Sequence, residues 1–563
     1  MNALQQPLVS IQELNVSFQS GNEIFHAVKN ISFDIPKGKI VAIVGESGSG
    51  KSVTSLGIMR LLPPTAKVSG KIIFNGEKDA KDLLHLPENA MRKFRGNVAS
   101  MIFQEPMTSL NPVHTCGAQV MEALQTHQHI SRKEALKKTI LLFQQLDLPE
   151  PEKLIEKYPH QISGGQKQRV MIAMAMSTQP QLLIADEPTT ALDVRVQKNI
   201  LDTLKKLQLE NGLSVLLITH DLAVVADYAD DIIVMYKGSV VEKGTASAVL
   251  QNPAHAYTKA LLACKPTPDK KGKPLPMLSN FLEGIPFESN PSPSIPVLAN
   301  KVLQVKNVVV RYPAAKNFLG KTTTWFNAVN DVSFDVFENE TIGLVGESGC
   351  GKTTLGRGIM QLQKIDFGKI VLNGKDLASA SQSSLKETRK ELQIVFQDPY
   401  GSLNPRITIG EAIMEPMMVH GISKNKREAR ERTAALLNRV NLPEDYISRY
   451  PHQFSGGQRQ RICIARSLAL NPKFLLFDES VSALDVSVQS QVLNLISELK
   501  RDYSFTSIFI SHDLHVVHYI SDRIMVMKKG EIVESGTADE VLFHPKNEYT
   551  KALIEAIPGC PRG

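Results

Sequence analysis

The sequence has no run of about 18 apolar residues, which is the length that a membrane-spanning helix needs. Its most apolar tract, residues 214–236, is interrupted by His220 and by four aspartates. The N-terminus also lacks the basic and then apolar layout of a signal peptide. The sequence therefore predicts neither a membrane span nor a secretory leader.

Cysteines are few and scattered. The five are Cys116, Cys264, Cys350, Cys463 and Cys560, and no two have the C-x-x-C spacing of a metal-binding pair. We therefore expect no disulfide framework, no structural zinc and no iron–sulfur cluster. Isolated thiols in a chain without a leader favour a reducing cytoplasm.

Neither sign of charge dominates strongly. Lys and Arg number 64 against 57 Asp and Glu, which gives a net charge of +7 spread over the whole length. This balance fits either attraction to an acidic membrane surface or nucleic acid, or an ordinary mixed solvated surface. We favour the mixed solvated surface. A chain of 563 residues is long enough for roughly three or four domains.

Two segments fit G-x-x-x-x-G-K-[ST], the phosphate-binding loop. The first is Gly45, Glu46, Ser47, Gly48, Ser49, Gly50, Lys51 and Ser52, and the second is Gly346, Glu347, Ser348, Gly349, Cys350, Gly351, Lys352 and Thr353. Glycines let successive backbone N–H groups point at an anion, at the start of a helix whose dipole favours negative charge. Each lysine would hold the β- and γ-phosphates of a nucleotide, and each hydroxyl would bind Mg²⁺. A chance lysine in a glycine-rich turn is the alternative, and the second copy makes it negligible.

An acid pair follows a short apolar run in each half. The runs are residues 182–185 and 474–477, and the pairs are Asp186 with Glu187 and Asp478 with Glu479. A buried strand delivers such acids to the edge of an α/β sheet, where ligands bind. The first acid suits Mg²⁺, and the second suits polarisation of the attacking water. A strand-end turn with two solvated acids is the less favoured interpretation.

A histidine and a glutamine also recur in both halves at strand ends. His220 and His512 each lie 33 residues after the glutamate of the acid pair. This equal spacing favours contact with the γ-phosphate over a structural role. Gln104 and Gln397 follow apolar runs, and their side chains can bind Mg²⁺ or order water.

A serine and two glycines begin a further apolar-periodic helix in each half. These segments are Ser163, Gly164, Gly165 and Gln166, and Ser455, Gly456, Gly457 and Gln458. Such a helix start can bind an anion, although a serine N-cap with a tight turn explains the same residues. Because each half already has a phosphate-binding loop, a second anion site implies an internal pseudo-dimer in which each half covers the nucleotide of the other.

Taken in order, these motifs resemble those of ATP-binding cassette (ABC) proteins with two fused nucleotide-binding domains. The resemblance implies ATP and Mg²⁺ as cofactors. It also implies Phe18 and Tyr312 as the aromatics that stack on adenine, with Phe25 and Phe326 as alternatives. The signature leucine of the family is replaced by Ile162 and Phe454, and Ser480 stands where the first half has Pro188 after its acid pair.

Finer features resemble the dipeptide and oligopeptide importer ATPases, in a fused layout similar to the glutathione and microcin C importer ATPases. The segments that carry this resemblance are residues 104–112 and 397–405, residues 158–161 and 450–453, and the closing P-x-x-x-Y-T-x-x-L segments at 253–261 and 545–553. The resemblance implies a peripheral protein at the cytoplasmic face of the inner membrane. Its partners would be two membrane permease subunits, which we expect to differ, and an extracytoplasmic solute-binding protein.

Prolines concentrate between the halves, in a stretch that reads as an extended, semi-rigid tether. We expect an α/β fold with ABC ATPase domains at residues 1–265 and 300–563 and a proline-rich linker at 266–299. Each domain would have a RecA-like core, an antiparallel β subdomain and a helical subdomain with the serine-glycine signature.

Two other functions share some of these features. A tandem ABC protein acting on ribosomes or nucleic acid would have a long, charged, helical linker, so we expect no nucleic-acid partner. An ABC exporter ATPase would share the catalytic motifs but not the closing segments.

Overall fold

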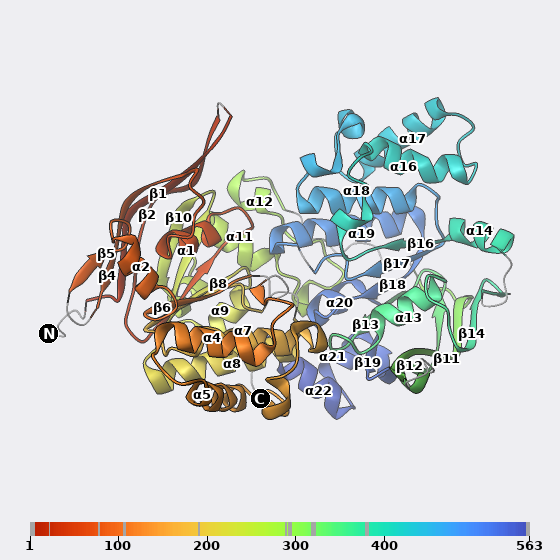
Figure 1. The fold of residues 1–563 in the computed structure, drawn as a ribbon. Coiled ribbons are helices and arrows are strands. Elements are labelled where there is room, and N and C mark those ends of the chain that lie inside the picture. The colour runs from red at the N-terminus through yellow and green to blue at the C-terminus, as the bar shows by residue number, and fades with distance from the viewer. Residues whose placement is uncertain are drawn as a thin grey trace.

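The structure, a computed structural model, describes residues 6–21, 23–76, 79–104, 109–189, 192–287, 290, 296–316, 322–377, 382–482 and 484–558 (Figure 1). No helix within these ranges is long and apolar enough to cross a bilayer.

Each half is built around a six-stranded sheet whose inner strands are parallel and whose last strand pairs antiparallel. In the first half the order is β10 (Ser239–Thr245), β9 (Asp231–Tyr236), β3 (Ile40–Val44), β8 (Ser214–Thr219), β7 (Leu182–Asp186) and β6 (Ala99–Ile102). In the second it is β16 (Leu392–Val395), β17 (Phe474–Asp478), β18 (Thr506–Ile510), β13 (Thr341–Val345), β19 (Arg523–Lys528) and β20 (Glu531–Thr537). Every residue of β3 and β13 is buried, as expected for strands covered on both faces.

A four-stranded antiparallel sheet lies beside each core. Its strands are β2 (Glu23–Ile35), β1 (Val9–Ser20), β4 (Ala66–Asn75) and β5 (Ala80–Asp82) in the first half, and β12 (Thr322–Phe337), β11 (Lys301–Lys316), β14 (Phe367–Leu372) and β15 (Lys375–Asp376) in the second. Apolar side chains of each antiparallel sheet and of one face of the parallel sheet form a shared core.

Helices cover the rest of each core sheet. In the first half they are α1 (Lys51–Ile58), α2 (Glu88–Phe94), α4 (Cys116–His127), α5 (Arg132–Gln145), α6 (Pro151–Leu154), α7 (Gly164–Met176), α8 (Val194–Asn211), α9 (Leu222–Tyr228), α10 (Ala246–Gln251) and α11 (Ala256–Cys264). In the second they are α13 (Lys352–Ile359), α14 (Gln382–Glu391), α15 (Pro399–Ser402), α16 (Ile409–Val419), α17 (Lys426–Arg439), α18 (Gly456–Leu468), α19 (Val486–Tyr503), α20 (Leu514–Ile520), α21 (Ala538–Phe543) and α22 (Glu548–Glu555). Short 3₁₀ turns lie at Pro159–Gln161, Glu444–Ser448 and Pro451–Gln453.

The two halves are arranged head to tail. Figure 1 shows the antiparallel sheets at opposite sides of the molecule, and α4 and α5 at the opposite end from α16 and α17. The helices α4, α5 and α7 pack together in the first half, as α16, α17 and α18 do in the second. The predicted core, antiparallel β subdomain and helical subdomain are therefore present twice.

The linker differs from the expected tether. Residues 266–282, which we call the strap, include a 3₁₀ turn at Pro268–Lys270 and α12 (Leu278–Leu282). Leu275 is 1% exposed and belongs to the core of the second half. The Asn494 side chain bonds both backbone groups of Leu275, each at 2.8 Å, and the Tyr519 hydroxyl donates to the Lys273 carbonyl at 2.8 Å. This part of the linker is therefore docked on the second half, because an apolar side chain and paired backbone groups hold it there.

Candidate nucleotide-binding sites

Each phosphate-binding loop connects a buried strand to a helix, β3 to α1 and β13 to α13. The loop glycines take left-handed backbone angles, with φ of 98° at Gly50 and 111° at Gly351. A Cβ at Gly50 would lie 2.5 Å from the Ala27 carbonyl oxygen, so no larger residue fits there. The helix after the first loop, α1, begins at Lys51, because the loop passes directly into it.

The loop lysines are buried and held against the loop backbone. Lys51 Nζ donates to the carbonyl oxygens of Gly45 at 2.7 Å and Glu46 at 2.9 Å, and Lys352 repeats both bonds with the same lengths. The ammonium group therefore lies beside the N–H groups of the loop, where phosphate oxygens would bind.

A hydroxyl and a carboxylate meet at the helix start of each site. Ser52 Oγ donates to Asp186 Oδ1 at 3.1 Å, and Thr353 Oγ1 donates to Asp478 Oδ1 at 3.0 Å. Burial raises the pKa of Asp186 to about 6 and raises the pKa of Asp478 as well. These are hard oxygen donors that a bound cation would keep ionised, so the residues fit Mg²⁺.

Within the described residues, no group of three or more His, Cys, Asp and Glu side chains could hold a metal ion. A cation at Asp186 or Asp478 would therefore take most of its ligands from phosphate and water, as Mg²⁺ does at nucleotide sites.

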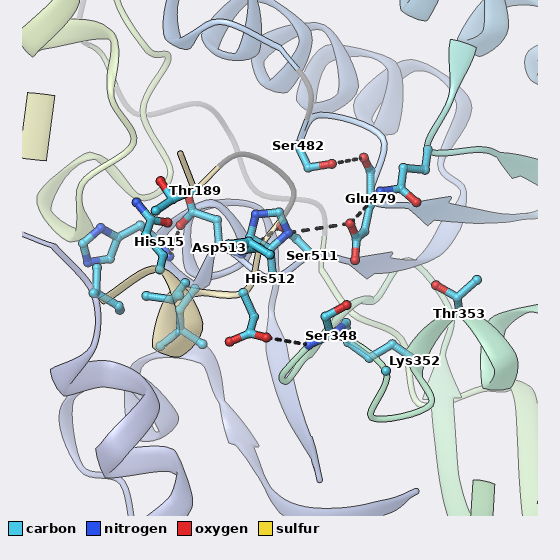
Figure 2. A pocket seen from close by; sticks show the side chains of 18 of the residues that line it. Thr189, Ser348, Lys352, Thr353, Glu479, Ser482, Ser511, His512, Asp513 and His515 are labelled. Atoms are coloured by element: carbon cyan, nitrogen blue, oxygen red, sulfur yellow. Dashed lines mark hydrogen bonds and ion pairs between the residues drawn. The ribbon is translucent and has the colours of Figure 1, made fainter. Parts of the chain in front are cut away.

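The glutamate of each acid pair lies between the predicted glutamine and histidine. Glu187 accepts a bond from Gln104 Nε2 at 3.0 Å and lies 3.5 Å from His220 Nδ1. Glu479 is 3.0 Å from Gln397 Nε2 and 3.6 Å from His512 Nδ1 (Figure 2). In each half the glutamine therefore bonds the glutamate, an arrangement that fits ordering of water as well as binding of Mg²⁺.

The contact between the glutamate and the histidine also shifts pKa values in each half. Burial lowers the pKa of His220, but the bond and charge of Glu187 together with the nearby aspartates outweigh burial, so the pKa lies above its ordinary value. Burial raises the pKa of Glu479, but the bond and charge of His512 together with the charge of Lys352 outweigh burial, so the pKa lies below its ordinary value. An ionised glutamate beside an imidazole can hold and polarise a water molecule.

Each phosphate-binding loop also contacts the other half. Ser47 N–H donates to Asp485 Oδ1 at 2.9 Å, and Ser348 N–H donates to Asp193 Oδ2 at 3.4 Å (Figure 2). A cavity of about 500 Å³ at the second loop is lined by Lys352 and Glu479 and, from the first half, by Asp193 and His220. The predicted facing of the two halves is thus present at the loops that follow the acid pairs. Residues 190, 191 and 483 of these loops lie outside the described residues.

The aromatic candidates for adenine are placed differently in the two halves. Tyr312 and Phe326 face each other across β11 and β12 and both line the cavity, so both remain candidates. Phe18 packs against the core of the first half, whereas its cross-strand neighbour Phe25 is 62% exposed. Exposure therefore favours Phe25 over the predicted Phe18.

The signature serines begin their helices as N-caps. Ser163 Oγ accepts from Gln166 N–H at 3.3 Å, and Ser455 Oγ accepts from Gln458 N–H at 3.4 Å. No signature residue is among the described residues that line the cavity. The structure therefore supports the capping role directly, and contact with a facing phosphate stays a prediction.

Sequence reasoning missed the contact that each closing segment makes with the phosphate-binding loop of its own half. The Tyr257 hydroxyl accepts from Glu46 N–H at 2.9 Å, and the Tyr549 hydroxyl accepts from Glu347 N–H at 3.2 Å. The recurrence of this tyrosine in both closing segments was the available signal. It also missed Arg195, whose Nη1 lies 2.6 Å from Glu347 Oε1 across the halves.

A family model for the ABC transporter matches residues 28–190 and 329–482, which is more than half of the chain. The chain belongs to the ABC transporter family. This confirms the predicted family and the predicted tandem fold, because the match occurs once in each half. A second model, the oligopeptide/dipeptide transporter C-terminal region, matches residues 241–284 and 533–562. These ranges contain both closing segments, and the first also contains the strap.

Curated relatives of this ABC protein match along nearly the whole chain. The glutathione import ATP-binding protein GsiA of Pectobacterium atrosepticum is 44% identical over 562 residues, 98% of this chain and 90% of the relative. GsiA of Escherichia coli strain K12 is 46% identical over 564 residues, 98% of this chain and 89% of the relative. The predicted resemblance to peptide-importer ATPases with fused domains is therefore confirmed.

Proposed function

We propose that this chain is the ATP-hydrolysing subunit of an ABC importer for peptides or related small peptide-like solutes, and that it drives a separate membrane permease. The observation that carries the proposal is that each half has a loop lysine, an acid pair, a glutamine and a histidine that could bind and hydrolyse ATP. These residues face the opposite half. The match of both closing segments to the oligopeptide/dipeptide transporter region supports the peptide class.

Residues of both halves would take part in each ATP site. Lys51 or Lys352 binds the phosphates, and Mg²⁺, when bound by Ser52 with Asp186 or Thr353 with Asp478, supplies charge neutralisation. Glu187 or Glu479 orients the water that attacks the γ-phosphate, while His220 or His512 holds the carboxylate in place. The Lys51 site is completed by the Ser455 signature, and the Lys352 site by the Ser163 signature.

The proposed partners follow from the importer function. The chain would bind peripherally at the cytoplasmic face of the inner membrane, against two permease subunits fed by an extracytoplasmic solute-binding protein. Closure of the halves on ATP and reopening after hydrolysis would move the permease. The GsiA relatives make glutathione a first solute to test.

Uptake in cells tests this function directly. The chromosomal Lys51→Ala/Lys352→Ala variant should lose uptake of the transported peptide while keeping its abundance, with wild type as control. Labelled glutathione and a panel of dipeptides and oligopeptides are the probes. Unchanged uptake of the whole panel, together with co-sedimentation of the chain with ribosomes rather than membranes, would support the rival nucleic-acid function.

We also propose that the two permease subunits differ. Tyr400 is 64% exposed and stacks on Arg459, whose guanidinium carbon lies 3.4 Å from the ring centroid. The corresponding residues of the first half, Glu105, Met107 and Thr108, lie outside the described residues, but their identities differ from Asp398, Tyr400 and Gly401. Drift after duplication is the alternative. Crosslinks from cysteines at positions 107 and 400 should reach different permease polypeptides, and one shared polypeptide would refute the proposal.

A further inference from the structure

The glutamates of the two phosphate-binding loops have different partners in the opposite half. Glu347 Oε1 lies 2.6 Å from Arg195 Nη1, an ion pair that crosses from the first half to the second. Glu46 instead accepts a hydrogen bond from Ser487 Oγ. Arg195 and Ser487 occupy the same place, two residues after the aspartate that contacts the facing loop. The two interfaces therefore differ by one full positive charge at the same position.

The surroundings of Glu347 extend this difference. The Arg195 guanidinium lies 5.9 Å from the centroid of the Tyr549 ring, and Lys528 Nζ lies 4.7 Å from the same centroid. The Tyr549 hydroxyl in turn accepts the Glu347 N–H bond. Two cations therefore lie on the tyrosine that holds this loop, and one of them pairs with the loop glutamate.

The surroundings of Glu46 are poorer in cations. Its N–H group is held by Tyr257, whose ring packs on Tyr236 at 4.3 Å between centroids, and Tyr236 stands where the other half has Lys528. Burial and then the Asp485 carboxylate raise the pKa of Glu46 to about 7, against the opposing effect of Lys51. At the position where the other site has an arginine, the loop glutamate of this site thus faces a neutral serine, with the Asp485 carboxylate nearby.

From these contacts we propose that the two ATP sites differ in their affinity for ATP, and that Arg195 makes the Lys352 site bind ATP more tightly. The Arg195–Glu347 pair holds the loop against the opposite half and neutralises a carboxylate next to the bound triphosphate. At the Lys51 site the corresponding carboxylate adds like charge near the triphosphate. The inference rests on the proposed ATPase function and specifies how its two sites divide the work.

Photolabelling of the full-length protein measures the two sites separately. A photoreactive ATP analogue with Mg²⁺ is added below saturation on ice, and peptide mapping assigns the label to the first or second half. The second half should take up roughly two- to fivefold more label, the range that one partly exposed ion pair supports. Arg195→Ser should bring the two halves to near parity, and Arg195→Lys should keep the excess because it keeps the charge.

A reciprocal exchange separates binding from general stability. Arg195→Ser/Ser487→Arg keeps the composition of the protein and should shift the excess of label to the first half, where the new charge faces Glu46. Glu347→Gln should keep the excess of label in the second half, since it removes a carboxylate near the triphosphate and leaves the Arg195 charge in place. Equal labelling in wild type, or an excess that Arg195→Ser leaves unchanged, would overturn the inference.

Loop variants tell this result apart from a failure of the proposed function. Lys51→Ala should remove the label from the first half only, and Lys352→Ala from the second only. If both losses occur while the ratio ignores Arg195, the ATPase function stands and the inequality falls. If neither loss occurs, ATP is not bound by these two loops, and the ATPase function and the inference are both refuted.

Discussion

At the scale of single residues, the two glutamates after the buried aspartates carry the strongest expectation. Glu187 and Glu479 have left-handed backbone angles, φ 46° and 47°, which cost free energy in a non-glycine residue and often mark functional sites. We predict that Glu187→Gln/Glu479→Gln retains ATP and loses turnover by about 10²–10⁴-fold, the usual effect of losing a general base. Phosphate release and retained radiolabelled ATP measure both effects.

The single variants provide the control for that experiment. Glu187→Gln and Glu479→Gln alone should each leave partial activity, or lose it cooperatively, because the other site is complete. Wild-type turnover by the double variant would mean that neither glutamate acts on water.

The loop glutamate Glu46 gives a prediction about pH. Its pKa is raised from 4.5 to about 7 in the contact with the second half, where it meets Asp485, Ser487, Lys51 and the hydroxyl of Tyr257. A carboxyl with a raised pKa favours the contact when protonated, so the contact weakens as the pH rises from about 4.5 to 7 and is constant above that. We expect the ratio of first-half to second-half photolabel to fall between about pH 4.5 and pH 7 and to stay constant above that.

Glu46→Gln is the matched control, because it is neutral at every pH and should give a flat ratio. The protonation of ATP itself affects both halves and cancels in the ratio. A ratio that falls equally in wild type and in Glu46→Gln would assign the pH dependence to another group.

At the residue scale, the sequence could predict those residues that recur at matching positions in both halves. Each histidine lies 33 residues after the glutamate of its acid pair, and each lysine has the same position within its loop motif, so repetition marks these residues as candidates. Arg195 could not be found this way, because its partner Glu347 is distant in sequence and its counterpart Ser487 is a different residue type. Phe18 and Phe25 are likewise indistinguishable by pattern, since only burial tells them apart.

At the scale of elements, the strap connects the first half to the core of the second. Leu275→Ala removes a buried side chain and should weaken strap docking by about 2–5 kcal/mol. Asn494→Ala should weaken it by a further ~1–3 kcal/mol, because two backbone groups of Leu275 lose their partner. Hydrogen–deuterium exchange over residues 266–282 measures the docking.

Leu282→Ala is the control for the strap, because this side chain on α12 is 36% exposed and should change exchange little. If Leu275→Ala leaves the exchange of residues 266–282 at the wild-type level, the strap is not held by that contact.

The proline-rich composition of the linker predicted an extended tether, but proline fixes only local backbone angles. Whether such a segment packs depends on the surface it meets, which composition does not describe.

At the scale of the whole molecule, the duplicated motifs predicted that the halves face each other, and reciprocal contacts now connect them. The Asp485 contact reaches the Lys51 loop, and the Asp193 contact reaches the Lys352 loop. Charge differences between the two interfaces remained hidden from the sequence, because they depend on which surfaces meet. The same contacts support the predicted pairing of each loop with the signature of the opposite half.

The last prediction follows from that pairing. The second glycine of each signature packs against the first turn of the next long helix, Gly457 on Val488 and Gly165 on Val196, so each signature is fixed beside its own interdomain aspartate. Asp485 contacts the Lys51 loop, so Ser455→Arg should place a bulky cation at that site and block its closure. Photolabel of the first half should fall while label of the second half persists, and Ser163→Arg should give the opposite pattern. If Ser455→Arg impaired only the Lys352 site, each loop would instead pair with the signature of its own half, against the geometry of both aspartate contacts.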